Sequence, residues 1–186
     1  MNKKMILPTL AFTIAALMGG AAQGLAAEKK QSVSKDFSAA ACLIQKNGHF
    51  LLPMTKFKSN VEMSLPIRKK KYAEVKKAIA DSGVDRNDSL AVAGVVARSG
   101  ARAELGLPMN KVSVLEKVGE IPTRRGPIIL FNCASSARPN MNQIQSRKVI
   151  GVEWVNPDTM RNDRGQPMPP FFKGKDRAFL QELKRR

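Results

Sequence analysis

The fold is decided by residues 88–107, which read Asp-Ser-Leu-Ala-Val-Ala-Gly-Val-Val-Ala-Arg-Ser-Gly-Ala-Arg-Ala-Glu-Leu-Gly-Leu. Apolar residues recur in this stretch at steps of three and four, which predicts a helix with one apolar stripe. The stripe consists of Leu90, Ala93, Ala97, Ala101 and Leu105. Asn87 or Asp88 can cap the start of the helix, while Gly106 favours a left-handed stop and Pro108 prevents continuation.

Two glycines inside this predicted helix, Gly94 and Gly100, each cost about 1 kcal/mol relative to alanine. The helix therefore needs tertiary packing to hold it. Glycine also lets another backbone come close, so we expect a neighbouring segment against this helix.

Upstream of the helix, the sequence predicts a hairpin. Residues 38–45 read as a buried strand, Asn47-Gly48 as a tight turn, and residues 49–54 as the return strand. Pro53 indicates that the return strand ends there or lies at an edge. Residues 55–66 read as a polar connection, and residues 68–82 as an amphipathic helix that ends at Gly83.

Downstream of the helix, three further strands are predicted, at residues 111–118, 127–135 and 149–155. The strand at 127–135 is apolar enough to be buried on both faces. Residues 123–126 read as a turn, and residues 176–183 as a short terminal helix. Strands and helices in this order predict an α/β (α+β) protein.

The end of the central helix, Glu104-Leu105-Gly106-Leu107, resembles the end of the Nudix box. That motif reads Gly, five residues, Glu, seven residues, Arg-Glu-apolar-x-Glu-Glu-x-Gly-apolar. If Gly106 and Leu107 are set on its last pair, Glu104 takes the second position of the Glu-Glu pair. Five other motif positions are not matched and carry Asp85, Ala91, Ser99, Gly100 and Ala103.

The resemblance extends over about residues 38–183 and implies a Nudix-like mixed β-sheet flanked by helices. Leu65-Pro66 is similar to the Leu-Pro that precedes the family's glycines, although Ile67-Arg68 stands where Gly-Gly is usual. The predicted helix at 68–82 looks like an insertion that lengthens this part of the chain. Trp154 also matches a common feature of the family's late strand.

The resemblance implies hydrolysis of a diphosphate linked to another group, with Mg²⁺ or Mn²⁺ as the cofactor. Glu104 is the one candidate metal ligand that remains in the motif, because Gly100 and Ala103 offer no side-chain oxygen. A catalytic site would need relocated carboxylates, drawn from Glu116, Glu120, Glu153 and Asp158. A cofactor is therefore expected only if the chain is catalytic.

The chain is strongly basic, with 32 Lys and Arg against 15 Asp and Glu and a net charge of +17. This charge predicts attraction to polyanions. The candidate ligand-binding residues are Arg68, Lys69, Lys70, Arg124 and Arg125. A solvated surface run is the alternative interpretation of the cations at 68–71, which the pattern places at a helix start against the macrodipole. No specific nucleic acid is expected, because an aromatic platform is lacking.

The first residues are typical of a secretory signal peptide. Lys3 and Lys4 precede an apolar run, and Gly24 and Ala26 form a small-residue cleavage site. The sequence therefore predicts a signal peptide at 1–26, a flexible arm at 27–37 and a single Nudix-like domain at 38–186. We expect an exported protein, periplasmic or secreted, with no transmembrane span in the mature chain.

The chain has two cysteines, Cys42 and Cys133, in apolar runs, and His49 is its single histidine. Buried thiols are favoured over a disulfide, although export would permit the disulfide. Because zinc sites draw on several Cys and His ligands, no zinc centre is expected in a chain with one histidine. A phosphate loop and a nucleophile elbow are also missing from the sequence.

Together these patterns favour a degenerate Nudix-like protein that binds an anionic, phosphate-bearing ligand, such as a nucleotide or an envelope phosphate group. Two alternatives remain open. One is an active metal-dependent pyrophosphohydrolase of nucleoside diphosphate-linked substrates with relocated ligands. The other is a non-catalytic interaction protein of the cell envelope.

Overall fold

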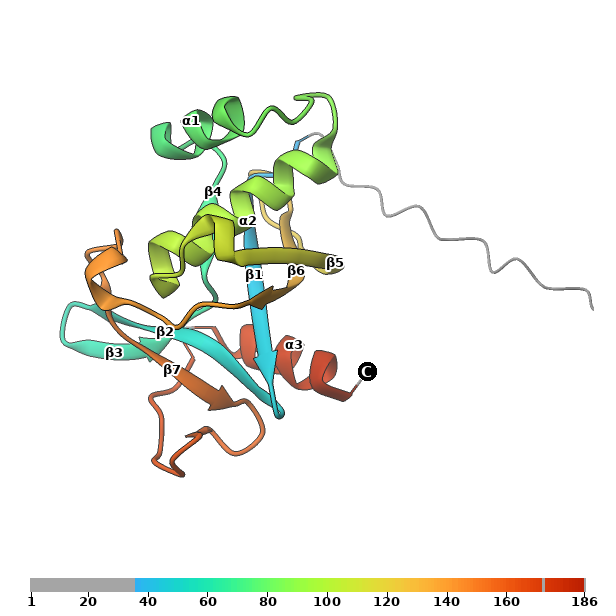
Figure 1. Cartoon of the computed structure of the whole chain (residues 1–186). Coiled ribbons are helices and arrows are strands. Elements are labelled where there is room, and N and C mark those ends of the chain that lie inside the picture. The colour runs from blue at the N-terminus through green and yellow to red at the C-terminus, as the bar shows by residue number, and fades with distance from the viewer. Residues whose placement is uncertain (1–35, 172, 186) are drawn as a thin grey trace, which may run out of the picture. The chain divides into compact units, whose positions relative to one another are not determined.

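Helix α2 (Ser89–Leu105) crosses one face of the sheet in the computed structural model, which describes residues 36–171 and 173–185 (Figure 1). The Asp88 carboxylate accepts hydrogen bonds from the backbone N–H groups of Leu90 and Ala91, which satisfies the first turn. Gly106 ends the helix with a φ of 66°. The predicted helix and both of its ends are confirmed. The predicted signal peptide and residues 27–35 of the predicted arm lie outside the described residues.

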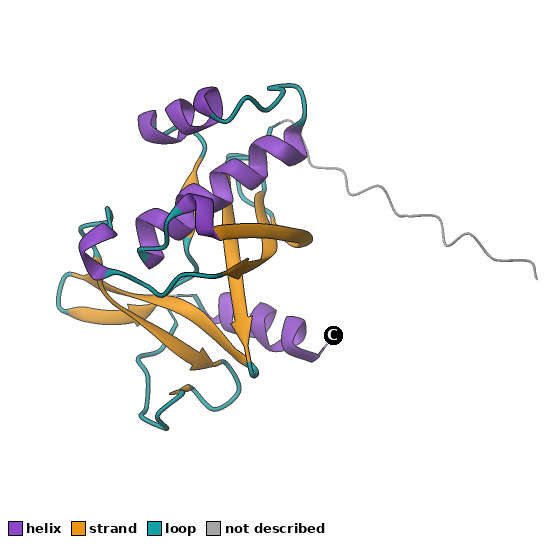
Figure 2. Cartoon of the chain, viewed as in Figure 1, coloured by secondary structure: helices purple, strands orange, loops and turns teal. Residues whose placement is uncertain are grey.

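The strands form one mixed sheet in the order β5-β6-β1-β2-β7-β8. β1 runs parallel to β6, and the other neighbours are antiparallel. Two short strands lie off this path, with β3 paired to β2 and β4 paired to β1. The strands are β1 (Ala39–Lys46), β2 (His49–Phe57), β3 (Asn60–Met63), β4 (Ile67–Lys69), β5 (Val112–Ile121), β6 (Ile128–Ser135), β7 (Val149–Asn156) and β8 (Arg161–Asn162). This mixed sheet flanked by helices confirms the predicted α+β class (Figure 2).

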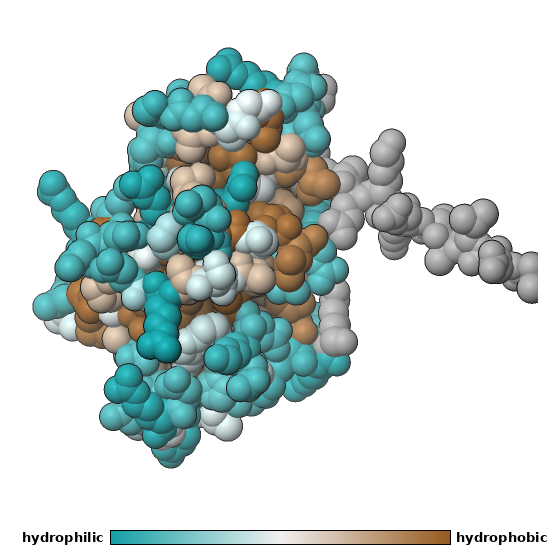
Figure 3. Space-filling view, in the orientation of Figure 1, coloured by the Kyte–Doolittle hydropathy of each residue, from teal (hydrophilic) through white to brown (hydrophobic). Residues whose placement is uncertain are grey.

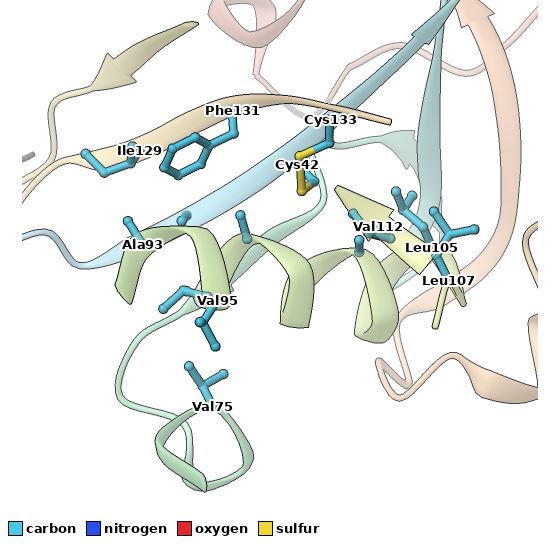
Figure 4. Close-up of a cluster of buried hydrophobic side chains, with 14 of the residues drawn as sticks. Cys42, Val75, Ala93, Val95, Leu105, Leu107, Val112, Ile129, Phe131 and Cys133 are labelled. Carbon is cyan, nitrogen blue, oxygen red and sulfur yellow. A yellow bond between two sulfur atoms is a disulfide. The ribbon is translucent and has the colours of Figure 1, made fainter. Parts of the chain in front are cut away.

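Two hydrophobic cores lie on opposite faces of β1. Cys42 and Ile44 belong to the core beneath α2, whereas Ala41 and Leu43 belong to the core that includes Leu180 of helix α3 (Gly174–Arg185). The first core also takes in helix α1 (Ala73–Asp81), and Figure 4 shows Val75 of α1 directed toward Val95 of α2. β6 is buried on both faces, as predicted, because Ile129 and Phe131 belong to the core beneath α2 and Leu130 belongs to the core on the other face.

The expectation that the second strand ends at Pro53 or lies at an edge is wrong, because β2 lies between β1 and β7 in the sheet. β2 continues to Phe57, and residues 55–66 contain the β2–β3 hairpin instead of a polar connection. Pro53 is opposite Val152 of β7, and its carbonyl accepts from the backbone N–H of Ser64. On the edge of β2 away from β7, the first residues of the strand pair with β1 and the residues from Met54 onward pair with β3. Pro53 lies between these two pairings, so its missing N–H is tolerated.

The predicted helix at 68–82 begins too early. α1 covers only Ala73–Asp81, and Arg68 belongs to β4, where it is opposite Ala40 of β1. The cations at 68–71 therefore do not occupy a helix start and do not oppose a helix dipole. Pairing with β1 overrides the local helical pattern because it adds backbone hydrogen bonds that the sequence period does not reveal.

The expectation of two buried thiols is also wrong, because Cys42 and Cys133 form a disulfide (Figure 4). The parallel pairing of β1 with β6 sets Cys42 opposite Phe131 and Ile44 opposite Cys133. The two cysteines thus face the same core diagonally, with their Cα atoms 5.5 Å apart, within the range that a disulfide requires.

The described residues all belong to one compact unit. Within this part of the chain, no helix is both long enough and apolar enough to cross a bilayer. In the space-filling view, hydrophobic residues gather over α2 and β5, whereas α1 is largely hydrophilic (Figure 3).

Candidate functional site

The backbone of β4 lies against the second half of α2. A Cβ atom built on Gly100 would lie 2.7 Å from the Pro66 carbonyl oxygen and 3.2 Å from the Cβ of Arg68. The expected close approach of a neighbouring segment is therefore found at this glycine. Gly100 takes the place of a glutamate in the Nudix motif, and the position has no room for that side chain.

Arg68 is buried beside the end of α2 and shares its guanidinium between two carboxylates. Its Nη1 lies 3.5 Å from Oε1 of Glu104, and its Nη2 donates a hydrogen bond to Oε1 of Glu74. The guanidinium also stacks over the Tyr72 ring, 4.5 Å from the centroid. Arginine is suited to this place because its planar donors can serve several acceptors at once. Sequence reasoning missed Glu74, which only the β4–α1 turn brings to Arg68.

Burial dominates the electrostatics of Glu104. It raises the pKa of this carboxyl above its ordinary value, because a low-dielectric environment disfavours the charged form. A hydrogen bond from Ser146 and the positive charges of Arg68 and Lys148 act in the opposite direction without cancelling the effect. Glu104 is thus a poorly solvated carboxyl whose nearest cation is an arginine of the same chain.

The residues around Glu104 do not fit a catalytic divalent ion. Among residues 36–171 and 173–185, no three Asp, Glu, His or Cys side chains come together as a metal site would need. Three of the four carboxylates proposed for relocation have other partners: Glu116 accepts from Asn132, Glu120 pairs with Lys117, and Asp158 pairs with Lys184. The fourth, Glu153, lies in β7 opposite Leu52 of β2. Mg²⁺ or Mn²⁺ at Glu104 would therefore lack a set of protein ligands among the described residues.

A second place, on the other side of β4, gathers positive charge. A cleft of about 970 Å³ is bordered by six cationic side chains, Lys69, Lys70, Lys71, Lys76, Arg86 and Arg125. They come from β4 and the turn after it, from α1, from the α1–α2 loop and from the β5–β6 turn. The described residues that line the cleft include no Asp or Glu.

Three of the predicted ligand-binding residues, Lys69, Lys70 and Arg125, line this basic cleft. Arg124 is exposed next to Arg125 but is not part of the lining, and Arg68 turns to Glu104 instead. The structure adds Lys71, Lys76 and Arg86. The lysines were visible as a charge cluster in the sequence, whereas nothing local points to Arg86.

The sequence matches no protein-family model and no curated protein. Its fold is similar to that of an ADP-ribose pyrophosphatase from Streptococcus suis, at 15% identity and a TM-score of 0.50, over 80% of this chain and 91% of that one. It is also similar to a MutT protein from Methanosarcina mazei, at 16% identity and a TM-score of 0.47, over 83% and 97% of the two chains. A NUDIX hydrolase from Nitrosomonas europaea matches at 11% identity and a TM-score of 0.46, over 78% and 86%.

The chain therefore has a Nudix-like fold, as the sequence predicted. At these identities the likeness concerns the fold alone. A shared fold does not carry over activity, which depends on the particular side chains at the site.

Proposed function

We propose that this chain is an exported Nudix-fold protein that has lost catalysis and binds an anionic, phosphate-bearing ligand in the basic cleft. The observation that carries the proposal is the convergence of six cations from separate segments on one cleft. In the described part of the chain, Lys69, Lys71, Lys76, Arg86 and Arg125 form no ion pair.

Bringing like charges together has an electrostatic cost. Their repulsion is only partly screened at separations within about 10 Å at 0.1 M salt. A phosphate-bearing ligand would replace this repulsion with attraction, and charge-assisted hydrogen bonds from Lys and Arg are among the stronger polar contacts. The positive charge of the cleft is thus that expected of an anion-binding site. Repulsion among its cations lowers the stability of the fold until an anion is bound.

Loss of catalysis is supported by the pairing of Glu104 with Arg68. A divalent ion at Glu104 would have to displace a buried guanidinium, and Gly100 and Ala103 would add no ligand. Because Mg²⁺ prefers six oxygen ligands in octahedral geometry, water and substrate would have to supply nearly all of them.

Export is supported by the signal-peptide pattern and by the disulfide, since structural disulfides persist mainly in oxidising compartments. Amino-terminal sequencing of protein from the envelope fraction should find Ala27 first. An intact Met1 on the isolated protein would contradict this part of the proposal.

Calorimetric titration with inorganic pyrophosphate tests the binding site. We expect saturable binding that weakens at least tenfold in the Lys69→Gln/Lys76→Gln variant. The matched control is Lys77→Gln/Lys111→Gln, which removes the same charge outside the cleft lining. An equal loss in both variants would mean that only the overall charge of the chain attracts anions, and the proposed site would be wrong.

A further inference from the structure

We propose that the ligand of the basic cleft is amphiphilic, with an anionic head group joined to an aliphatic chain. This inference rests on the proposed function and narrows it to a class of ligand. The aliphatic part of this ligand would lie along the floor of the cleft. The lysines and arginines at the border of the cleft would hold the head group.

The floor of the cleft is aliphatic. Its apolar lining brings together single residues from five elements, namely Ala39 of β1, Ile67 of β4, Ile79 of α1, Val92 of α2 and Ile128 of β6. Ala39, Ile79 and Val92 are buried beneath this floor. The half-buried Ile67 and Ile128 present the apolar surface that an anion without an apolar part would leave in contact with water. Covering that apolar surface would favour binding.

The cleft has little that would recognise a nucleobase. Phe37 is the one aromatic residue among its described lining, and this side chain is only 3% exposed. The Lys70 ammonium covers its ring at 4.4 Å from the centroid. Recognition of a base without hydrogen bonds would require an exposed aromatic ring on which the base can stack. The Phe37 ring cannot serve in this way.

The uncharged polar side chains of the lining are already engaged within the protein. Ser38 and Thr123 both donate from their hydroxyl groups to the carbonyl oxygen of Gly126. Reading a base edge or a ribose needs polar groups directed at the ligand, since these provide specificity in small-molecule sites. Charge and aliphatic contact remain as the two means of recognition that the cleft side chains offer.

The size of the cleft agrees with a ligand larger than a phosphate group. Its volume of about 970 Å³ is at the upper end of the range of about 300–1,000 Å³ that is typical of small-molecule pockets. A bare phosphate or pyrophosphate would occupy only a small part of it.

A series of alkyl phosphates with one head group tests the inference. Methyl, butyl and octyl phosphate are titrated below their micelle concentrations, with octyl glucoside as the uncharged control. We expect affinity to rise at least tenfold from methyl to octyl phosphate, because each CH₂ group that leaves water for the aliphatic floor favours binding. Octyl glucoside should bind far more weakly than octyl phosphate.

Two variants test which side chains of the cleft contact the aliphatic part of the ligand and which contact its head group. Ile128→Thr, which keeps a β-branched shape, should lower affinity for octyl phosphate and leave methyl phosphate unchanged. Lys76→Gln should lower affinity for both, with the adjacent Lys77→Gln as the control. A cooperative urea transition in each variant establishes that it is folded.

The outcomes separate the inference from the proposed function. If pyrophosphate and all the alkyl phosphates bind with equal affinity, the cleft is an anion site and the amphiphilic ligand is wrong. If none of these anions binds, the proposed function itself is wrong. If octyl glucoside binds as well as octyl phosphate, the cationic border plays no part and both ideas fail.

Discussion

Nη1 of Arg68 lies 3.5 Å from Oε1 of Glu104, which is 36 residues further along the chain. Both side chains are nearly buried, with exposed fractions of 11% and 13%. The pair joins β4 to the end of α2, at the helix end that resembles the Nudix motif. Arg68 thus supplies the positive charge beside the Glu104 carboxylate. This pairing indicates that Glu104 bears on the stability of the fold more directly than on catalysis.

Replacing Arg68 with methionine should destabilise the fold. The change leaves Glu104 buried without its nearest cation, and breaking a buried ion pair on one side typically costs about 3–5 kcal/mol. We expect about 2–4 kcal/mol, because Glu74, the second partner, is 45% exposed and can be hydrated. Urea unfolding at pH 7 measures the loss.

Two further variants test whether the loss comes from the unpaired carboxylate. Arg68→Met combined with Glu104→Gln should recover part of the stability, because no uncompensated charge remains beside α2. Lys77→Ala breaks the exposed pair with Asp81 and should change stability by less than about 1 kcal/mol. If the double variant is no more stable than Arg68→Met, packing of the arginine side chain explains the loss instead.

Glu104 should make the protein less stable as the pH rises from acid toward neutral. Its pKa in the folded chain is raised above the ordinary value of 4.5, so the folded state holds the proton more tightly than the unfolded state. The stabilising contribution is present below the unfolded pKa and is lost as the pH rises through the folded pKa. Urea unfolding at several pH values from 4 to 7 should therefore show that the wild type loses stability relative to Glu104→Gln. A difference that is constant over this range would contradict the raised pKa.

Reduction of the disulfide should lower the free energy of unfolding by about 4–5 kcal/mol, according to the chain-entropy model. The estimate follows from the 91 residues that separate Cys42 from Cys133. Urea unfolding with and without dithiothreitol measures the cost. The Cys42→Ala/Cys133→Ala variant should be less stable than the oxidised wild type and insensitive to the reductant. A wild type that is equally stable in both conditions would mean that the bridge contributes nothing.

Helix α2 could be predicted from the sequence because all of its signals are local. Its cap, its apolar period and its terminal glycine lie within twenty residues, and each acts within a helical turn. Strand β4 could not be predicted in the same way, because three residues carry no recognisable period. Its conformation follows from pairing with β1, about thirty residues earlier in the chain.

The same distinction applies to the sites. Lys69 and Lys70 stood out because they are neighbours in sequence, and both line the basic cleft. Arg86 gave no signal because the α1–α2 connection, and not its sequence neighbours, brings it there. The disulfide depends on the diagonal register of two parallel strands, which composition and spacing do not specify.

Alanine at the two helix glycines should have opposite effects. At Gly94 a Cβ atom meets nothing closer than 3.8 Å, so Gly94→Ala should stabilise the protein by about 0.5–1 kcal/mol through helix propensity. At Gly100 the Cβ would lie 2.7 Å from the Pro66 carbonyl oxygen, and this overlap should outweigh the same gain. Thermal unfolding of both variants compares them directly. A stabilised Gly100→Ala would show that β4 is not held tightly against the helix.

The chain should lack Nudix-type catalysis, because Glu104 is the one carboxylate that remains at the glutamate positions of the motif. Glu104 would have to hold a divalent ion with Gly100 and Ala103 as its neighbours in the motif, while Arg68 already provides its countercharge. Both ion affinity and stabilisation of the charge that develops on phosphate weaken when ligands are lost. We expect no appreciable hydrolysis of nucleoside diphosphate-linked compounds in Mg²⁺ or Mn²⁺, and little difference between the wild type and Glu104→Gln. A phosphate-release assay over a panel of such compounds measures this, with an active pyrophosphohydrolase as the positive control. Robust turnover that Glu104→Gln abolishes would establish an active enzyme with relocated ligands and overturn the proposed loss of catalysis.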